Sequence, residues 1–199
     1  MANTTSNMLE LGSKASEFCL PDTEGNKVTL SDVATGKKGL VVAFICNHCP
    51  YVIHIAPQLA KLASEYQQKG IGFVAINSND IQQYPEDDMN HMREEKRQRA
   101  YPFHYLLDEE QSVAKAYAAA CTPDIYLFDA QQSLIYRGQF DGSRPRRISS
   151  GNYDSSENQA DGSDLRNAMD ALLTGGQVTS QQIASMGCNI KWKPGNEPV

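Results

Sequence analysis

An apolar run that ends in a closely spaced cysteine pair constrains the fold of this chain more than any other feature. The run LVVAFIC, residues 40–46, is followed by Asn, His and a second cysteine, Cys49. A continuous apolar run of this length predicts a buried strand. From residue 50 onward apolar residues recur at helical spacing, which predicts a helix over 50–69. We therefore expect Cys46 and Cys49 where a buried strand ends and a helix begins.

Length and charge exclude several classes of protein. The 199 residues suffice for one domain with a full core and a modest extension. A net charge of -6 argues against a nucleic-acid binder, which needs a basic face. No apolar run approaches the roughly 18 residues of a membrane span, and the N-terminal segment has no basic start followed by an apolar core. We expect a cytoplasmic protein, in which five cysteines favour redox or metal chemistry over structural disulfides.

Strands and helices are predicted to alternate along the chain. The pattern predicts, in order, a hairpin over 18–32, the strand 40–46, the helix 50–69, a buried strand over 71–77, a charged helix over 85–100 with Pro85 and three acids at its start, a short strand over 103–108, a helix over 109–120, an antiparallel pair over 125–129 and 134–139, a long loop over 141–163, and a helix over 164–176.

This order of elements, with a C-x-x-C where the first long helix begins, is typical of a thioredoxin-like fold. We predict an α/β protein with a central mixed sheet flanked by helices, an N-terminal hairpin and a C-terminal extension. We divide the chain into an N-terminal arm (1–13), a thioredoxin-like domain (14–176) and a tail packed on that domain (177–199).

The cysteine pair has the spacing of a redox dithiol. Because a helix start presents unpaired N–H groups and a positive dipole end, we expect the pKa of Cys46 to fall below its usual value of about 8.5. Cys46 would then attack a disulfide, and Cys49 would resolve the mixed disulfide. A protonated His48 would stabilise the Cys46 thiolate and make the pair a stronger oxidant. The alternative is that His48 merely faces solvent.

Several segments resemble one known family. They are FCLPDTEGNKVTLSD, CNHCPYV, YLLDEEQSVAKAY, CTPDIYLFD, YRGQFDGSRP and GCNIKWK. Together they resemble the peroxiredoxin-like (alkyl hydroperoxide reductase and thiol-specific antioxidant) branch of the thioredoxin-like superfamily, in a subfamily that carries C-x-x-C. The resemblance covers roughly residues 12–193. It implies that Cys46 is the nucleophile and Cys49 the resolving cysteine. It also implies that Thr122-Pro123 forms a cis-proline turn facing the site, where Thr122 offers its backbone to a substrate.

The chain departs from the peroxiredoxin pattern before its first cysteine. Peroxiredoxins place a proline seven residues and a threonine three residues before the peroxide-reactive cysteine, whereas this chain has Gly39 and Ala43. An arginine is also expected near the site, and Arg137 and Arg144 are the candidates. These departures argue against efficient peroxide reduction.

Three further cysteines have open roles. Cys121, two residues before Pro123, is either a third redox thiol or a packed residue; Cys188 in the tail is a packed or idle thiol, or exchanges with Cys121 or Cys46. Cys19, in an apolar segment, is expected to be a small core residue. Four cysteines could form a zinc site, but such sites usually use two close pairs and only one is present here, so we expect no metal and no cofactor.

Three functions remain in order of preference. The first is a thiol-disulfide oxidoreductase that uses Cys46 and Cys49. The second is a thiol peroxidase with antioxidant activity, in which Cys46 reacts with peroxide. The third is a metal-binding or structural thioredoxin-like module. The partners expected for the first two are protein or small-molecule disulfides and thiols, peroxides, and a thiol reductant such as thioredoxin or glutathione, with neither nucleic acid nor membrane involved.

Overall fold

A five-stranded mixed sheet forms the centre of the molecule in the computed structural model, which describes residues 3–197. Residues 1–2 and 198–199, the ends of the predicted arm and tail, lie outside the described residues. The strand order is β6-β5-β4-β8-β9; β6, β5 and β4 are parallel to one another, β8 is antiparallel to β4, and β9 is antiparallel to β8. The strands are β4 (Gly39–Phe44), β5 (Ile71–Asn77), β6 (His104–Leu107), β8 (Asp124–Asp129) and β9 (Leu134–Gly138). The predicted mixed sheet is confirmed.

The central strand β4 is apolar throughout because both faces of the sheet are covered. Val41 and Ala43 belong to the core on one face, and Val42 and Phe44 belong to the core on the other. All four side chains are at most 3% exposed. The continuous apolar run in the sequence therefore reflects a strand buried on both sides.

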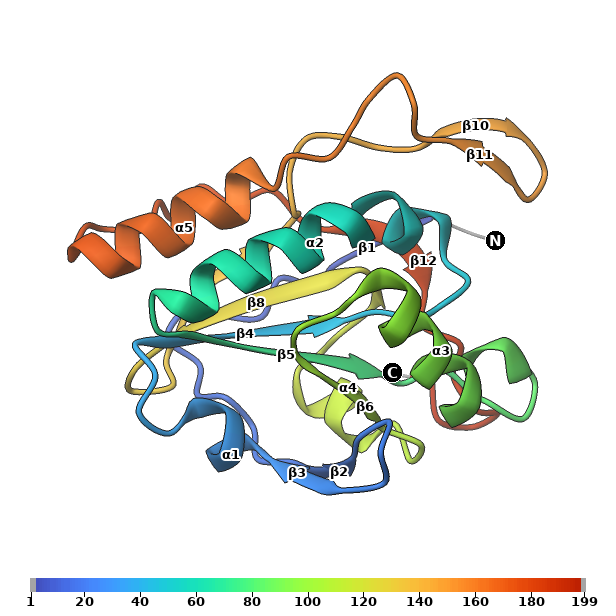
Figure 1. Cartoon of the computed structure of the whole chain (residues 1–199), viewed down its shortest axis with the longest axis horizontal. Coiled ribbons are helices and arrows are strands. Elements are labelled where there is room, and N and C mark those ends of the chain that lie inside the picture. The colour runs from blue at the N-terminus through green and yellow to red at the C-terminus, as the bar shows by residue number, and fades with distance from the viewer. Residues whose placement is uncertain (1–2, 198–199) are drawn as a thin grey trace.

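Helices cover the two faces unequally (Figure 1). The long helices α2 (Pro50–Gln68) and α5 (Ser163–Thr174) lie along one face. The other face is covered by α1 (Leu30–Ala34), α4 (Ser112–Ala116) and the predicted N-terminal hairpin, formed by β2 (Cys19–Pro21) and β3 (Lys27–Thr29). The helix predicted over 109–120 is shortened to five residues, and Ala118 just beyond it has a left-handed backbone (φ 50°).

The helix predicted over 85–100 is broken near its start. A 3-10 turn, η1 (Pro85–Asp87), precedes α3 (Met89–Arg99), and Asp88 between them is extended. The Asp88 carboxylate accepts a hydrogen bond from the N–H of His91 and so caps α3. The break turns Asp87 into the interior, where it is 0% exposed. The prediction that all three acids favour the helix dipole was therefore wrong for Asp87.

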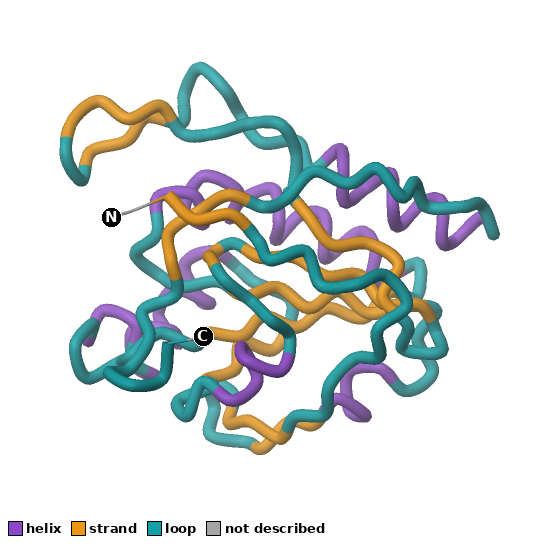
Figure 2. Tube along the Cα trace, turned by 180° about the vertical axis from the view of Figure 1, so that it is seen from behind, coloured by secondary structure: helices purple, strands orange, loops and turns teal. Residues whose placement is uncertain are grey.

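Two segments predicted to lack regular structure contain strands. The segment predicted as a long loop carries the exposed hairpin of β10 (Arg146–Ser149) and β11 (Asn152–Asp154), which extends away from the sheet (Figure 2). The tail contributes β12 (Met186–Asn189). This strand lies between β1 (Asn3–Thr5) and β7 (Cys121–Thr122) in a second sheet. Neither strand pairing was predicted from the sequence.

Candidate active site

The cysteine pair lies at the carboxyl end of β4, where ligands and reactive groups gather in parallel sheets. Cys46 follows the strand, and Cys49 is the N-cap residue of α2, one residue before Pro50. Cys46 is 1% exposed and Cys49 is 0% exposed. All five cysteines of the chain carry free thiols. The predicted position at a strand–helix junction is confirmed.

Both sulfurs converge on the turn before β8. The peptide bond between Thr122 and Pro123 is cis, as the resemblance implied. The Sγ of Cys46 lies 3.4 Å from the hydroxyl oxygen of Thr122. The Sγ of Cys49 donates a hydrogen bond of 3.1 Å to the Thr122 carbonyl. Thr122 therefore contacts both members of the pair, once through its side chain and once through its backbone.

A buried carboxylate, which the sequence interpretation missed, accompanies the pair. Asp87 lies 2.8 Å from the Nδ1 of His48 through its Oδ2. Its Oδ1 accepts a hydrogen bond from the N–H of Asn47 (2.8 Å), and its Oδ2 accepts one from the side-chain amide of Asn79 (2.7 Å). One signal existed: β5 ends in Asn77 and is followed by Ser78 and Asn79, at the same sheet edge as the cysteines.

His48 does not face solvent freely, because its ring contacts both Tyr84 and Asp87. Its ring stacks on Tyr84, with ring centroids 5.9 Å apart, and its side chain is 18% exposed. Burial lowers the pKa of His48, but the hydrogen bond and charge of Asp87 outweigh burial, so the pKa is raised overall. The positive charge of a protonated His48 is therefore balanced by the negative charge of Asp87.

The two thiols have opposite tendencies to ionise. Burial raises the pKa of Cys46 well above its usual value, and its hydrogen bond with Cys49 and the negative charge of Asp87 act in the same direction. Burial also opposes ionisation of Cys49, but hydrogen bonds, first among them that of Cys188, lower its pKa well below the usual value. The expected low pKa of Cys46 is wrong because its thiol is fully buried and lies near Cys49 and the charge of Asp87.

The remaining cysteines differ from one another in environment. Cys19 is exposed on β2, because its neighbours Phe18 and Leu20 turn toward the core instead, so its predicted core role is wrong. Cys121 is buried and its thiol donates to the carbonyls of Pro123 (3.5 Å) and Ser185 (3.9 Å). Cys188 is 2% exposed and belongs to the same buried cluster as Cys46 and Cys49.

Neither candidate arginine contacts the cysteine pair. The guanidinium of Arg137 donates to the carbonyl of Leu9 and to the side chain of Gln182. Arg144 donates to Gln139 and lines, with Pro123, a cavity of about 20 Å³. The Thr122 hydroxyl, and not a side chain at position 43, lies 3.4 Å from the Cys46 sulfur.

The site also offers a donor set for a metal ion. The ligand atoms of Cys46, His48 and Asp87 lie within 4.8 Å of one another. Sulfur, imidazole nitrogen and carboxylate oxygen are all zinc ligands. Both carboxylate oxygens of Asp87 already accept hydrogen bonds, from Asn47 and Asn79, so a metal would have to compete with these contacts.

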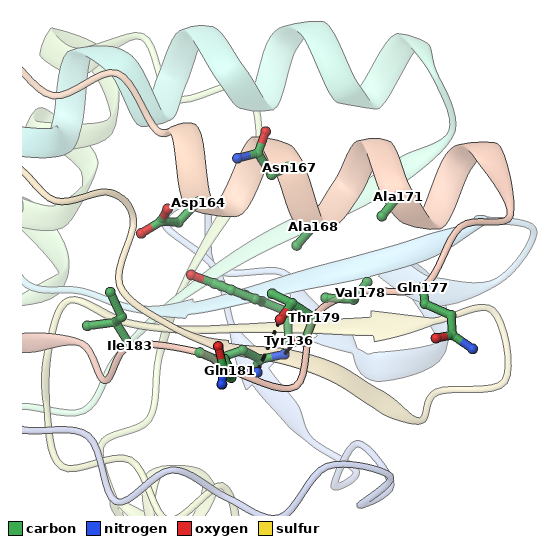
Figure 3. Close-up of a pocket in the computed structure, with 11 residues that line it drawn as sticks. Tyr136, Asp164, Asn167, Ala168, Ala171, Gln177, Val178, Thr179, Gln181 and Ile183 are labelled. Carbon is green, nitrogen blue, oxygen red and sulfur yellow. Dashed lines mark hydrogen bonds between the residues drawn. The ribbon is translucent and has the colours of Figure 1, made fainter.

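A larger cavity lies elsewhere in the molecule. A cavity of about 280 Å³ lies between α5 and the segment 177–183, and Figure 3 shows its lining residues. Tyr136, Asp164 and Ile183 are among its lining residues, which include no cysteine. We therefore do not associate it with thiol chemistry.

The fold agrees with comparisons to known proteins. The thioredoxin domain of a thiol-disulfide oxidoreductase from Bacteroides vulgatus has a TM-score of 0.56 to this chain at 20% identity, covering 65% of this chain and 88% of that one, which shows the fold. The chain is a thioredoxin-like protein of the oxidoreductase class. Its residues 11–137 match the AhpC/TSA family, and the chain belongs to that family.

Two further proteins are similar to this chain. An uncharacterized conserved protein from Geobacillus kaustophilus is 48% identical, with a TM-score of 0.89 and 98% of each chain covered. The thiol-disulfide oxidoreductase ResA of Halalkalibacterium halodurans is 32% identical over 69 residues, which are 35% of this chain and 38% of that protein. Among the described residues, no helix combines the length and apolar character needed to cross a bilayer.

Proposed function

We propose that this protein is a thiol-disulfide oxidoreductase with Cys46 as the nucleophile and Cys49 as the resolving cysteine. The observation that carries the proposal is the convergence of both sulfurs on Thr122, at 3.4 Å from its hydroxyl and 3.1 Å from its carbonyl. A substrate chain aligned along Thr122 and Pro123 would present its disulfide to Cys46. The name of the ResA relative supports the same reaction class.

The reaction divides into two exchanges. Cys46 loses its proton to solvent, and its thiolate attacks one sulfur of a substrate disulfide to form a mixed disulfide. The other substrate sulfur leaves as a thiol after protonation from solvent. Cys49 then attacks Cys46, the Cys46–Cys49 disulfide forms, and the second substrate sulfur departs with the proton of Cys49. The substrate is reduced by two electrons, and the dithiol is oxidised.

His48 and Asp87 are proposed to set the redox potential together. A protonated His48 favours the Cys46 thiolate and so the reduced pair, whereas Asp87 raises the pKa of Cys46 and opposes this effect. Because the two charges are paired, we expect a potential closer to that of thioredoxin than His48 alone would give.

The setting of the reaction is part of the same proposal. The partners are protein or small-molecule disulfides, with thioredoxin or glutathione as reductant, in the cytoplasm. Because Cys46 is 1% exposed, a neighbouring side chain must move to admit them. Residues 14–176 are proposed as the catalytic domain, with the arm 1–13 and the tail 177–199 packed on it.

One observation favours peroxide reduction as a second candidate. The Thr122 hydroxyl, 3.4 Å from the Cys46 sulfur, provides the polar contact that Ala43 lacks. Peroxide would oxidise Cys46 to a sulfenic acid, which Cys49 would convert to a disulfide with release of water.

The decisive experiment measures the redox couple of the pair. Purified protein is equilibrated in glutathione buffers, its thiols are trapped by alkylation, and each cysteine is quantified by mass spectrometry. We expect a two-electron couple at Cys46 and Cys49, whose value is compared with about -270 mV for thioredoxin. The Cys46→Ser variant should lose disulfide turnover, the Cys49→Ser variant should accumulate a mixed disulfide at Cys46, and the exposed-site control Cys19→Ser should match the parent protein.

Two outcomes would overturn the proposal. Rapid consumption of peroxide, with sulfenic acid at Cys46 and no turnover of disulfides, would support the peroxidase. Stoichiometric zinc, with thiols that react only after a chelator is added, would support the metal-binding module.

A further inference from the structure

Strand pairing brings a third thiol to the cysteine pair. In the β7–β12 ladder, Cys188 lies directly opposite Thr122, and Asn189 lies opposite Cys121. Side chains of directly opposed residues in antiparallel strands project on the same face of the sheet, with Cβ atoms about 5 Å apart. Cys188 therefore projects on the face from which the Thr122 side chain contacts Cys46.

The burial of these residues agrees with that placement. Cys46, Cys49 and Cys188 belong to one buried cluster, and each is at most 2% exposed. Hydrogen bonding with Cys49 is the main cause that raises the pKa of Cys188, while the same contact lowers the pKa of Cys49. Cys188 thus lies in the same buried cluster as Cys49 and directly opposite Thr122, whose carbonyl accepts the hydrogen bond of Cys49.

We propose that Cys188 is a third redox-active cysteine, which exchanges with the proposed Cys46–Cys49 disulfide to form a Cys49–Cys188 disulfide. The inference rests on the proposed oxidoreductase function and adds an internal relay to it. Oxidation would begin at Cys46 and end in the bond between α2 and β12. The protein would stay oxidised by two electrons in the buried Cys49–Cys188 disulfide, while Cys46 returns to a free thiol.

The exchange requires no further oxidant. The sulfur of Cys188 attacks the sulfur of Cys49, the Cys49–Cys188 bond forms, and the Cys46–Cys49 bond breaks. Cys46 leaves as a thiolate and takes up the proton lost by Cys188. The number of disulfides is unchanged, so the step is an isomerisation, and attack of the Cys46 thiolate on the Cys49 sulfur, with Cys188 as leaving group, reverses it.

Cys121 is a matched control on the same strand. It is adjacent to Thr122, so its side chain projects on the opposite face of β7. Its thiol contacts the carbonyls of Pro123 and Ser185. Although Cys121 is as deeply buried as Cys188, the geometry assigns it no part in the relay.

Tryptic peptide mapping separates the possible disulfides. The Cys46–Cys49 bond lies within the peptide 39–61, whereas the Cys49–Cys188 bond joins the peptide 39–61 to the peptide 167–191, and a bond to Cys121 would join it to the peptide 116–137. The parent protein and the Cys46→Ser variant are oxidised in glutathione buffers, alkylated and digested without reduction.

We expect the 39–61/167–191 cross-link in both proteins, with free, alkylated Cys46 in the cross-linked parent. In the Cys46→Ser background, a further Cys121→Ser exchange should leave the cross-link intact, and a further Cys188→Ser exchange should abolish it.

The inference and the proposed function can fail separately. If the parent forms only the internal 39–61 disulfide and the Cys46→Ser variant keeps Cys49 and Cys188 as free thiols, the relay is wrong and the oxidoreductase stands. If the cross-link forms in the variant but the parent protein turns over no substrate disulfide, the relay chemistry stands and the proposed function is wrong.

Discussion

The Asp87 carboxylate is held by hydrogen bonds from Asn47 and Asn79 and lies 2.8 Å from His48, without exposure to solvent. Burial is the main cause that raises the pKa of Cys46, and the negative charge of Asp87 acts in the same direction because it disfavours the thiolate. At the scale of single residues, the reactivity of the pair therefore depends on a group some forty positions away in the sequence.

The first prediction concerns this carboxylate. In the Asp87→Asn variant we expect the pKa of Cys46 to fall, because the nearby negative charge is lost. Alkylation of Cys46 by iodoacetamide, followed by mass spectrometry across a pH series, should show its midpoint at lower pH than in the parent. The variant should also lose roughly 1–3 kcal/mol of stability, since an amide cannot accept all the bonds of the carboxylate.

Asp88→Asn provides the matched control for this experiment. Asp88 adjoins Asp87 but caps α3 through His91, so its replacement should leave the alkylation midpoint of Cys46 unchanged. Equal midpoints in the Asp87→Asn variant and the parent would contradict the electrostatic role of Asp87.

Spacing was enough to pair Cys46 with Cys49, and the family resemblance implied that the Thr122-Pro123 turn lies beside them. The inward turn of Asp87 was not predictable, because Pro85 followed by three acids is equally typical of an ordinary helix start. The difference lies in the polar side chains after β5, whose contacts with Asp87 exist only in the folded chain.

At the scale of the elements, the pairing of β12 with β7 brings the backbone of Gly187 very close to the cis-proline turn at Thr122-Pro123. A Cβ atom placed on Gly187 would collide with the carbonyl group of Thr122. This strand could not be predicted from local pattern, because it is short and its partners lie far away in the sequence, in β1 and β7. In contrast, β4 and β5 were predicted almost to the residue, since burial on both faces gives a continuous apolar run.

The second prediction tests this packing. The Gly187→Ala variant should lose roughly 1–3 kcal/mol in urea denaturation, because the added methyl group pushes β12 away from β7. Cys188 should also become more reactive toward iodoacetamide. Gly142→Ala is the control, since nothing lies within 4 Å of a Cβ at that position. Identical stability of the two variants would show that β12 accommodates the methyl group without displacement.

At the scale of the whole molecule, we expect one buried acid, Asp124, to make the free energy of unfolding depend on pH. Asp124 opens β8 and is 0% exposed. Burial raises its pKa from 3.8 to about 6, despite hydrogen bonds from Ser6, Ala120 and Tyr126. Between these two values the folded protein binds more protons at Asp124 than the unfolded chain does. The free energy of unfolding should therefore fall as the pH rises through this window.

The third prediction isolates this effect. A shift of about two units corresponds to about 3 kcal/mol, so the parent should lose about that much stability relative to Asp124→Asn between about pH 4 and about pH 6. Urea denaturation of both proteins across this range provides the measurement. Asp129→Asn, at the other end of the same strand, is the control. A constant difference between parent and Asp124→Asn would mean that Asp124 is ionised throughout.

The second sheet has a consequence for how the molecule is made. Ribosomes deliver β7 well before β12, yet β12 is the strand that lies between β7 and β1. Until residues 186–189 emerge, the strand carrying Thr122 has an open edge, and the sulfur of Cys49 lacks its contact with Cys188. The nascent chain thus completes its reactive centre only after β12 has been made, and a product that stops before β12 would expose unprotected thiols beside an unpaired strand.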